Sequence, residues 1–300
     1  MSEDEINNEC DSIVDDYVNK HFGVSKKNTP RFMYRFNKIR ENVHFLVLHI
    51  IEELKNSGFE PVDCELKIDG DIPGYEVVLP TGQKILLRGS VDRVDILKKG
   101  EENYIRIIDY KTGSKEFKLS DILYGLNLQM LIYLYAITLG GEERYGKVTP
   151  AGILYMPATV KPISADNTIS DEQINEQVSK GLKMNGMLLN SLDVIHNSDA
   201  AYISFNTKNG TLTAGGSLAS LEELGMIFKK LDMTVAKMGT TLYSGDVEAS
   251  PLKGGKDSCE YCPYDSICAY HMSDCRNSFS LKNDEVCRIL DEEQENGGEG

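Results

Sequence analysis

The sequence lacks an excess of positive charge. Across its 300 residues, 32 lysines and arginines stand against 47 aspartates and glutamates, which gives a formal net charge of −15 at pH 7. This balance excludes a histone-like or generally basic coat for nucleic acid, because such proteins bind through a large surplus of cations. It still allows a local basic or metal-lined groove.

Long apolar runs and a secretory leader are also missing. No stretch reaches the roughly 18 to 20 apolar residues that a membrane-spanning helix needs. The first ten residues, MSEDEINNEC, are polar and acidic, unlike a secretory signal. We therefore expect a soluble, cytoplasmic protein that does not bind a membrane. The sequence contains no internal repeat and no glycine-rich phosphate loop.

The cysteines do not have the pattern of a disulfide framework. Their number is seven, which is odd, and no secretory signal precedes them, so a disulfide-rich fold is not expected. Four of the seven fall between positions 259 and 275. Such clustering in a cytosolic chain indicates that the thiols bind a metal ion or a cluster.

Hydrophobic periodicity predicts an α/β fold, with a mixed central sheet flanked by helices. Helices are expected over residues 11–22, 30–57, 120–139, 171–188 and 218–238, and strands over 64–68, 75–79, 85–97, 104–110 and 153–156. The acidic residues after 279 predict a disordered tail.

The segment Arg88–Gly113, RGSVDRVDILKKGEENYIRIIDYKTG, carries the most informative charges. Two strand-like runs flank a loop, with Asp92 inside the first run and Asp109 near the end of the second. Lys111 follows Asp109 by two positions, so both side chains point to one face of the strand. Apolar neighbours place the two carboxylates in or next to buried strands, where an unpaired charge is costly.

A divalent cation would offset that cost. Mg²⁺ takes oxygen ligands, keeps several waters and usually accepts one or two carboxylates from a protein. Bound there, it lowers the pKa of a water and offsets charge that develops on a phosphate. Lys111 is then placed to orient or deprotonate the water, or to stabilise the transition state. The alternative is a surface ion-pair ladder without chemistry, which is the commoner role of an isolated Asp-x-Lys.

Three motifs, in this order, resemble those of the RecB-type nucleases of the PD-(D/E)XK superfamily. The motifs are Gly89-Ser-Val-Asp92-Arg-Val-Asp95, Ile108-Asp109-Tyr110-Lys111-Thr112-Gly113 and Gly125-Leu-Asn-Leu-Gln129-Met-Leu-Ile-Tyr133. The resemblance implies a restriction-endonuclease-like core and a deoxyribonuclease, of the exonuclease type, that uses Mg²⁺ or Mn²⁺. It also implies roles for six residues: Asp92, Asp109 and Tyr110 in the metal site, Lys111 as the catalytic lysine, and Gln129 and Tyr133 as supports for the lysine or the DNA phosphate.

Other polar residues near the motifs have more ordinary interpretations. Asp95 points to the opposite face of its strand from the metal-site aspartate, and we interpret it as a partner of Arg93. Glu65, in the preceding strand, is either an accessory acid of the site or a sheet-edge charge. His44 and His49 lie off the centre of a helical apolar stripe, so we interpret them as boundary histidines rather than metal ligands.

Cys259, Cys262 and Cys268 form the pattern C-x2-C-x5-C. Thiolates two residues apart on a turn can bind one metal ion or cluster together. On spacing alone, zinc and iron–sulfur are equally open, with His271 or Cys275 as the fourth ligand, and inert free thiols are a third possibility.

The same pattern follows the nuclease motifs in the AddB subunits of bacterial helicase–nucleases, which this chain resembles over about residues 30–275. There it holds a [4Fe–4S] cluster, whose fourth cysteine comes from before the nuclease core. The resemblance therefore implies a [4Fe–4S] cluster, DNA ends as substrate, an AddA-type helicase subunit as partner, and a role in double-strand break processing and recombinational repair. The implied organisation is a polar segment (1–29), a RecB-like nuclease core with a helical insertion (30–245), an iron–sulfur-type segment (246–278) and the acidic tail (279–300).

Two features of that family are absent from the expected places. Before the long helix there is only Cys10, without the family's aromatic followers, and His21 is a poor match for its histidine metal ligand. We expect a fragment that starts downstream of both features and lacks the fourth cluster thiolate, unless Cys10 or Cys275 supplies it. Two other functions stay open: a catalytically incomplete module that binds DNA or a helicase partner without cutting, and a zinc-stapled structural domain.

Overall fold

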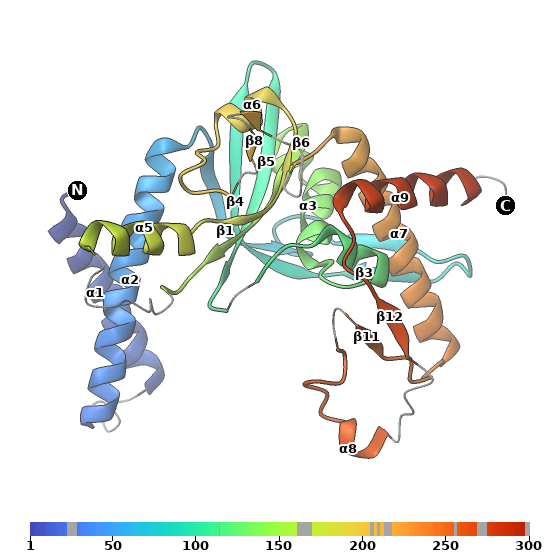
Figure 1. The fold of residues 1–300 in the computed structure, drawn as a ribbon, viewed down its shortest axis with the longest axis horizontal. Helices are drawn as coiled ribbons and strands as arrows, with labels where there is room; N and C mark the ends of the chain where they lie inside the picture. The colour runs from blue at the N-terminus through green and yellow to red at the C-terminus, as the bar shows by residue number, and fades with distance from the viewer. Residues whose placement is uncertain are drawn as a thin grey trace.

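The computed structural model describes residues 1–22, 29–113, 115–160, 170–204, 207–208, 211–212, 218–254, 257–268 and 275–297. At its centre is a six-stranded mixed sheet in the order β1-β4-β5-β6-β7-β10 (Figure 1). Its strands are β1 (Glu60–Ile68), β4 (Gly89–Lys99), β5 (Glu102–Lys111), β6 (Val148–Pro157), β7 (Asn185–Leu189) and β10 (Leu218–Ala219). The predicted α/β architecture with a mixed sheet is confirmed.

Helices and short strand pairs surround this sheet. The helices are α1 (Glu3–Phe22), α2 (Pro30–Asn56), the 3₁₀ helix η2 (Leu119–Tyr124), α3 (Gln129–Gly140), α4 (Glu142–Tyr145), α5 (Asp171–Gly181), α6 (Leu192–His196), α7 (Leu221–Ser244), α8 (Asp265–Cys268) and α9 (Asn283–Gly297). The strand pairs are β2 (Tyr75–Val78) with β3 (Lys84–Leu87), β8 (Thr207–Lys208) with β9 (Thr211–Leu212), and β11 (Leu252–Gly254) with β12 (Arg276–Ser278).

The central strand β5 is buried on both faces from Tyr104 to Asp109. A strand covered on both sides reads as a nearly continuous apolar run, which is why the sequence around Ile105 to Ile108 has little alternation. Helix α3 packs on β5 and β6, and α7 packs on α3. Charged side chains within β5 are therefore enclosed by the fold, and each needs a partner.

The long helix α2 begins and ends close to where the sequence predicts. Pro30 occupies its first turn, where the missing N–H costs nothing, and Thr29 caps it by accepting a hydrogen bond from Phe32 N–H at 3.3 Å. Helix α1 packs beside it, with Asp11 3.1 Å from Arg40 Nε. Together these two helices form the α1–α2 hairpin, one of two parts that project from the sheet (Figure 1).

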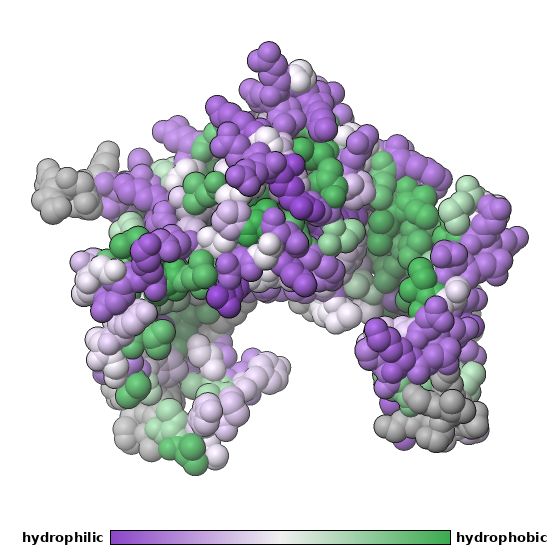
Figure 2. Space-filling view, turned by 180° about the vertical axis from the view of Figure 1, so that it is seen from behind, coloured by the Kyte–Doolittle hydropathy of each residue, from purple (hydrophilic) through white to green (hydrophobic). Residues whose placement is uncertain are grey.

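The second projecting part is the cysteine-rich segment with β11, α8 and β12. The molecule is hollowed between the two projections, and Figure 2 shows this hollow from behind. The loop that follows β5 lies at the end of the sheet that faces the hollow (Figure 1). Among the helices that the structure describes, none combines the length and the apolar character required to cross a bilayer.

Three expected elements are wrong in detail. The helix predicted over 120–139 is interrupted between η2 and α3, where Gly125 and Asn127 have φ of 73° and 54°, values that an α-helix cannot hold. The strand predicted over 85–97 is two strands, β3 and β4, in different sheets. The helix predicted over 171–188 ends at Gly181, and its last residues form β7 instead. There the sheet provides pairing on both sides, which outweighs the helix propensity of Met187 and the leucines beside it.

The expectation of a disordered tail is wrong for residues 283–297. They form α9, which packs on α7 and buries Val286 and Leu290. These two side chains are four residues apart and so lie on one helical face. Glu293 Oε2 adds an ion pair with Lys230 Nζ at 2.6 Å. The acidic composition therefore did not reveal the apolar stripe of Val286 and Leu290, which is sufficient to dock α9 on α7.

Candidate active site

Strands β4 and β5 form a fork at the predicted catalytic residues. The two strands pair as far as Arg93 and Ile108. Beyond this point β4 continues beside β1, while β5 continues beside β6 as far as Lys111. Asp92 and Asp109 are the first residues past the last β4–β5 pair, so one stands on each arm of the fork.

A hydrogen bond closes the fork where main-chain pairing stops. Asp92 Oδ2 accepts the main-chain N–H of Tyr110 at 2.9 Å, which holds the carboxylate of one arm against the residue that follows Asp109 on the other. Asp109 is only 6% exposed. Its Oδ2 is buried and accepts no hydrogen bond in the described part of the chain, but the Lys111 ammonium contacts it as an ion pair. The structure therefore brings the three predicted residues to one place.

The donor groups at the fork fit a hard divalent cation. They are carboxylates on two adjacent strands, and one of them has a buried oxygen that, among the described residues, forms an ion pair with Lys111 but no hydrogen bond. Mg²⁺ accepts such a pair and completes its shell with water or substrate oxygens. In the described ranges, no three or more histidine, cysteine, aspartate or glutamate side chains are grouped so as to hold a metal ion. The side chains alone would thus supply part of the coordination shell.

Only the main chain of Tyr110 belongs to the fork. Its hydroxyl lies on the other face of the sheet, where it accepts a hydrogen bond from Arg93 Nη1 at 3.2 Å. Burial raises the pKa of this phenol, although the charge of Arg93 opposes the shift. A neutral hydroxyl on the far face cannot bind the same ion as the aspartates, so any metal contact of Tyr110 has to come from its backbone.

Gln129 and Tyr133 meet each other at the start of α3, where Gln129 Nε2 donates to the Tyr133 hydroxyl at 3.2 Å. The Tyr133 ring lies against the main chain of β4: a Cβ added to Gly89 would stand 2.2 Å from the Tyr133 hydroxyl oxygen. Glycine at this position therefore permits a contact three residues before Asp92. Neither side chain hydrogen-bonds to Lys111 in the described structure, so their support of the lysine stays a prediction.

A buried charge network of Glu53, Arg93, Asp95 and Arg106 lies on the opposite face from Asp109 and Lys111. Arg93 binds Asp95 Oδ1 through Nε at 2.8 Å and Glu53 Oε2 through Nη2 at 3.0 Å. Arg106 binds Asp95 Oδ2 through Nε at 3.0 Å and Glu53 Oε1 through Nη2 at 2.9 Å. All four side chains are at most 3% exposed, and their formal charges sum to zero.

This network confirms the interpretation of Asp95 as a partner of Arg93. Glu53 and Arg106 are residues that the sequence analysis missed. The sequence did contain a signal that Arg106 is buried and paired. It lies within the apolar run of β5, and Asp95 stands opposite it on β4. Glu53 had no such signal, since it belongs to a helix far along the chain. The network connects α2 to the sheet and, through Arg93 and Tyr110, to the fork.

The other polar residues have ordinary contacts. Glu65, on the edge strand β1, accepts a hydrogen bond from Ser90 Oγ at 3.0 Å and has a left-handed φ of 54°, which supports the interpretation as a sheet-edge charge. His44 Nε2 lies 2.7 Å from Asp11 Oδ1. The His49 ring packs 5.2 Å from the Tyr202 ring, and burial lowers its pKa. These contacts support boundary histidines.

The cysteine motif lies between the paired strands β11 and β12. Cys262 N–H donates to the Cys259 carbonyl at 3.1 Å, which forms a turn, and Cys268 ends α8. These thiols do not converge into a group that could hold a metal ion, within the ranges that the structure describes. Cys10 belongs to α1, on the other side of the hollow from α8 (Figure 1), so the fold separates it from the motif. Of the candidate fourth ligands, His271 lies outside the described residues.

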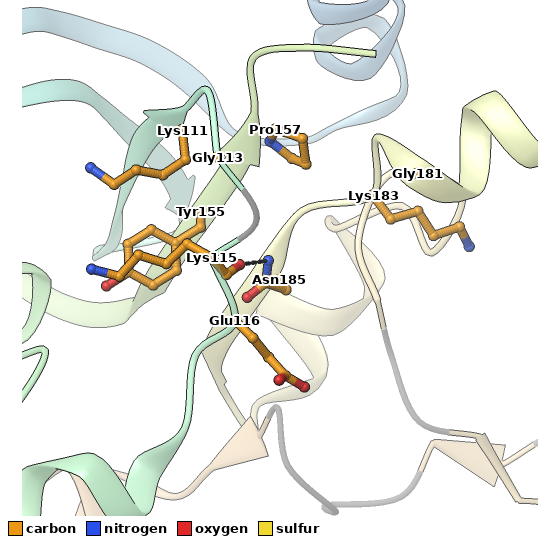
Figure 3. Close-up of a pocket in the computed structure, with 9 residues that line it drawn as sticks. All are labelled: Lys111, Gly113, Lys115, Glu116, Tyr155, Pro157, Gly181, Lys183 and Asn185. Atoms are coloured by element: carbon orange, nitrogen blue, oxygen red, sulfur yellow. Dashed lines mark hydrogen bonds between the residues drawn. The ribbon is translucent and has the colours of Figure 1, made fainter. Parts of the chain in front are cut away.

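A polar pocket of about 320 Å³ adjoins the fork. It is lined by Lys111, Gly113, Lys115, Glu116, Tyr155, Pro157, Gly181, Lys183 and Asn185 (Figure 3). Tyr155 on β6 pairs with Asp109, and Asn185 on β7 pairs with Tyr155, so these three residues form one row across the sheet. Burial and then the charges of Asp109 and Asp121 raise the pKa of Tyr155 to about 12. No sequence signal indicated this pocket, because β7 reads locally as helix.

Comparison with known proteins places the chain among nucleases. Residues 3–269 match the family described as "PD-(D/E)XK nuclease superfamily". The chain is 34% identical, over 97% of its length, to a protein of Caldanaerobacter subterraneus subsp. tengcongensis that is named as a subunit of an ATP-dependent helicase/deoxyribonuclease, and it covers 26% of that protein. It is 33% identical to the protein of the same name from Thermoanaerobacter sp. and 34% identical to that from Clostridium acetobutylicum, with 97% and 96% of this chain and 27% and 26% of the relatives covered. The chain thus spans about a quarter of the length of these relatives.

Proposed function

Because the chain belongs to the PD-(D/E)XK nuclease superfamily, we propose that it is the Mg²⁺-dependent nuclease domain of a helicase–deoxyribonuclease and that it hydrolyses phosphodiester bonds at DNA ends. The observation that carries this proposal is the fork. There Asp92, Asp109 and Lys111 meet, and a buried carboxylate oxygen has an ammonium as its described partner. A purely structural ion pair would not require the second carboxylate.

The residues of the fork have distinct roles in this proposal. Asp92, Asp109 and the main chain of Tyr110 would hold Mg²⁺ or Mn²⁺, which when bound lowers the pKa of a water and neutralises charge on the phosphate. Lys111 holds its proton on Nζ beside Asp109, where it can orient the attacking water or donate to a phosphate oxygen as negative charge develops there. Gln129 and Tyr133 support this end of β4.

The relatives' name suggests the wider setting. They are named as a subunit of an ATP-dependent helicase/deoxyribonuclease. By analogy, this chain would act in the cytoplasm, on DNA ends that an AddA-type helicase subunit delivers, during double-strand break processing and recombinational repair. A partner that feeds the strand suits a chain of net charge −15, because DNA affinity depends on phosphate neutralisation.

A [4Fe–4S] cluster on Cys259, Cys262 and Cys268 is the proposed second cofactor. Its role would be structural, since the motif lies between β11 and β12 and not at the fork. We expect the anaerobically purified chain to show a visible sulfur-to-iron charge-transfer band, which filled-shell zinc cannot give, and Cys262→Ser to remove it. A colourless protein with one equivalent of zinc would contradict the cluster and favour a zinc staple.

The nuclease proposal is tested by incubating the chain with end-labelled single-stranded DNA. Cleavage is expected with Mg²⁺ or Mn²⁺ and not with EDTA. Two carboxylates and one ammonium together carry a net negative charge, so a divalent cation is needed to neutralise the phosphate. The products are resolved on a denaturing gel, and circular DNA separates exonuclease from endonuclease activity. Retention of DNA without cleavage under any metal condition would contradict the proposal and support the module that binds without cutting.

A further inference from the structure

We propose that the pocket beside Lys111 binds a phosphate of single-stranded DNA next to the scissile one, and that Lys115 is its phosphate-binding residue. This inference rests on the proposed nuclease function, which supplies the ligand. It concerns the pocket residues Lys115, Tyr155 and Asn185, which lie outside the motifs that indicate the chemistry. Three properties of the pocket support it: its position, its charge and the hydrogen bonds that hold its loop.

The position of the pocket is set by the strand register. Tyr155 stands opposite Asp109, and Lys115 lies over the Tyr155 ring, with Nζ 5.2 Å from its centroid. Adjacent strands are roughly 4.8 Å apart, so the pocket begins on β6, about one strand spacing from Asp109 at the fork. Successive phosphates of one DNA strand rise roughly 3.4 Å along a duplex and are further apart when the strand is extended. A strand with one phosphate at the fork therefore brings the next within reach of Lys115.

The charges at the pocket favour an anion. Figure 3 shows the ammonium groups of Lys111 and Lys115 on the same side, while the Glu116 carboxylate points away from both. The third lysine, Lys183, donates to the Ala200 carbonyl at 2.7 Å and is turned away from the other two (Figure 3). Lys111 is ion-paired with Asp109, so the Lys115 ammonium over the Tyr155 ring is the further positive charge that the pocket presents to a polyanion.

Hydrogen bonds also hold the main chain of the pocket's loop in place. Asn185 Nδ2 donates to the Lys115 carbonyl at 2.9 Å, and Asn185 Oδ1 accepts Phe117 N–H at 2.9 Å, so one amide clamps the loop on both sides of Glu116. Beneath the Lys115 side chain, Tyr155 is only 2% exposed, so its ring is packed into the core. A loop whose main chain is held in this way loses less conformational freedom on binding than an open one.

The test is the salt dependence of binding. Affinity for an oligothymidine is measured in EDTA, which prevents cleavage, over a range of NaCl concentrations. Because each lost phosphate contact on a single strand lowers the slope of log K against log salt by roughly 0.7, Lys115→Ala should show this decrease and bind roughly fivefold more weakly at about 0.1 M salt. Lys115→Arg should retain the wild-type slope. Lys183→Ala is the matched control, with an unchanged slope, since its ammonium is held by Ala200.

A second measurement locates the contact. Oligonucleotides that each carry one neutral methylphosphonate linkage should include one, adjacent to the cleaved linkage, that weakens binding to the wild-type chain but not to Lys115→Ala, because the two changes remove the same interaction. If the slope of log K against log salt is unchanged in Lys115→Ala, or if the wild-type chain does not bind the oligonucleotide, the proposal that Lys115 binds a phosphate is wrong. The nuclease function is judged separately: if Asp109→Asn cuts DNA like wild type, the function is wrong even where the slope changes as expected.

Discussion

Asp109→Asn is expected to lower Mg²⁺-dependent cleavage of single-stranded DNA by at least about 1,000-fold, because several kcal/mol of transition-state stabilisation depend on the bound cation. The amide keeps the shape of the carboxylate but loses the charge that would bind the ion. The buried Oδ2, which now contacts Lys111, would become part of a neutral group. Initial cleavage rates at saturating Mg²⁺ measure the effect.

The chain should still fold in this variant. An isosteric change leaves no cavity, and the lost partner, Lys111, has a side chain that is 30% exposed, so the free energy of unfolding should change by no more than about 1 kcal/mol. Glu65→Gln, the same chemical change on the edge strand β1, is the control and should cut at close to the wild-type rate. Equal rates for wild type and Asp109→Asn would exclude the proposed chemistry. A loss in Glu65→Gln would restore the accessory-acid interpretation.

Glu53→Ala is expected to lower the free energy of unfolding by about 3–5 kcal/mol, because it removes one carboxylate from a buried set of charges. Arg93 and Arg106 would each lose a hydrogen-bonded partner at 3.0 and 2.9 Å. Neither guanidinium can lose its proton to reduce the cost. Equilibrium unfolding in urea measures this change, and it should move the midpoint without altering the slope.

The neighbouring residue provides a matched control. Glu52 lies on the same helix and pairs with Lys55, but these two side chains are 54% and 64% exposed, so Glu52→Ala should cost at most about 0.5 kcal/mol. Glu53→Gln should fall between the two, since the amide keeps one acceptor and loses the charge. A cost for Glu53→Ala no larger than that for Glu52→Ala would mean that water reaches the network.

The sequence alone was enough to place the three residues of the fork on two neighbouring strands, but not to show that these strands diverge there. Asp92, Asp109 and Lys111 lie within strands whose pairing is local along the chain, because β4 and β5 are joined by a short turn. Alternation within each strand then sets which side chains meet. The same short-range logic paired Asp95 with Arg93. The long helix α2 was also predictable, since its periodicity and its N-terminal signals agree.

The pocket and the complete charge network were not predictable in this way. Tyr155, Asn185 and Glu53 come to their places through contacts between segments that lie far from the fork along the chain, and one sequence does not specify such pairings. Met187 and the two leucines after it have helix propensity, and pairing with β6 and β10 makes this segment a strand. The prediction of a disordered tail was wrong for a different reason. Two apolar residues four positions apart, Val286 and Leu290, dock the helix on the core despite its acidic composition.

The fork also makes its two aspartates unequal as experimental probes. Asp92 occupies the position of a main-chain acceptor at the branch, since its carboxylate takes the Tyr110 N–H that β4 no longer reaches. Replacing it would leave that donor unsatisfied and would splay the arms, so a loss of turnover in an Asp92 variant would mix chemistry with architecture. Asp109 Oδ2 accepts no hydrogen bond from the described backbone. Its substitution therefore removes an ion pair but no main-chain contact of that oxygen, and assignments of rate effects at this branch should be based on Asp109.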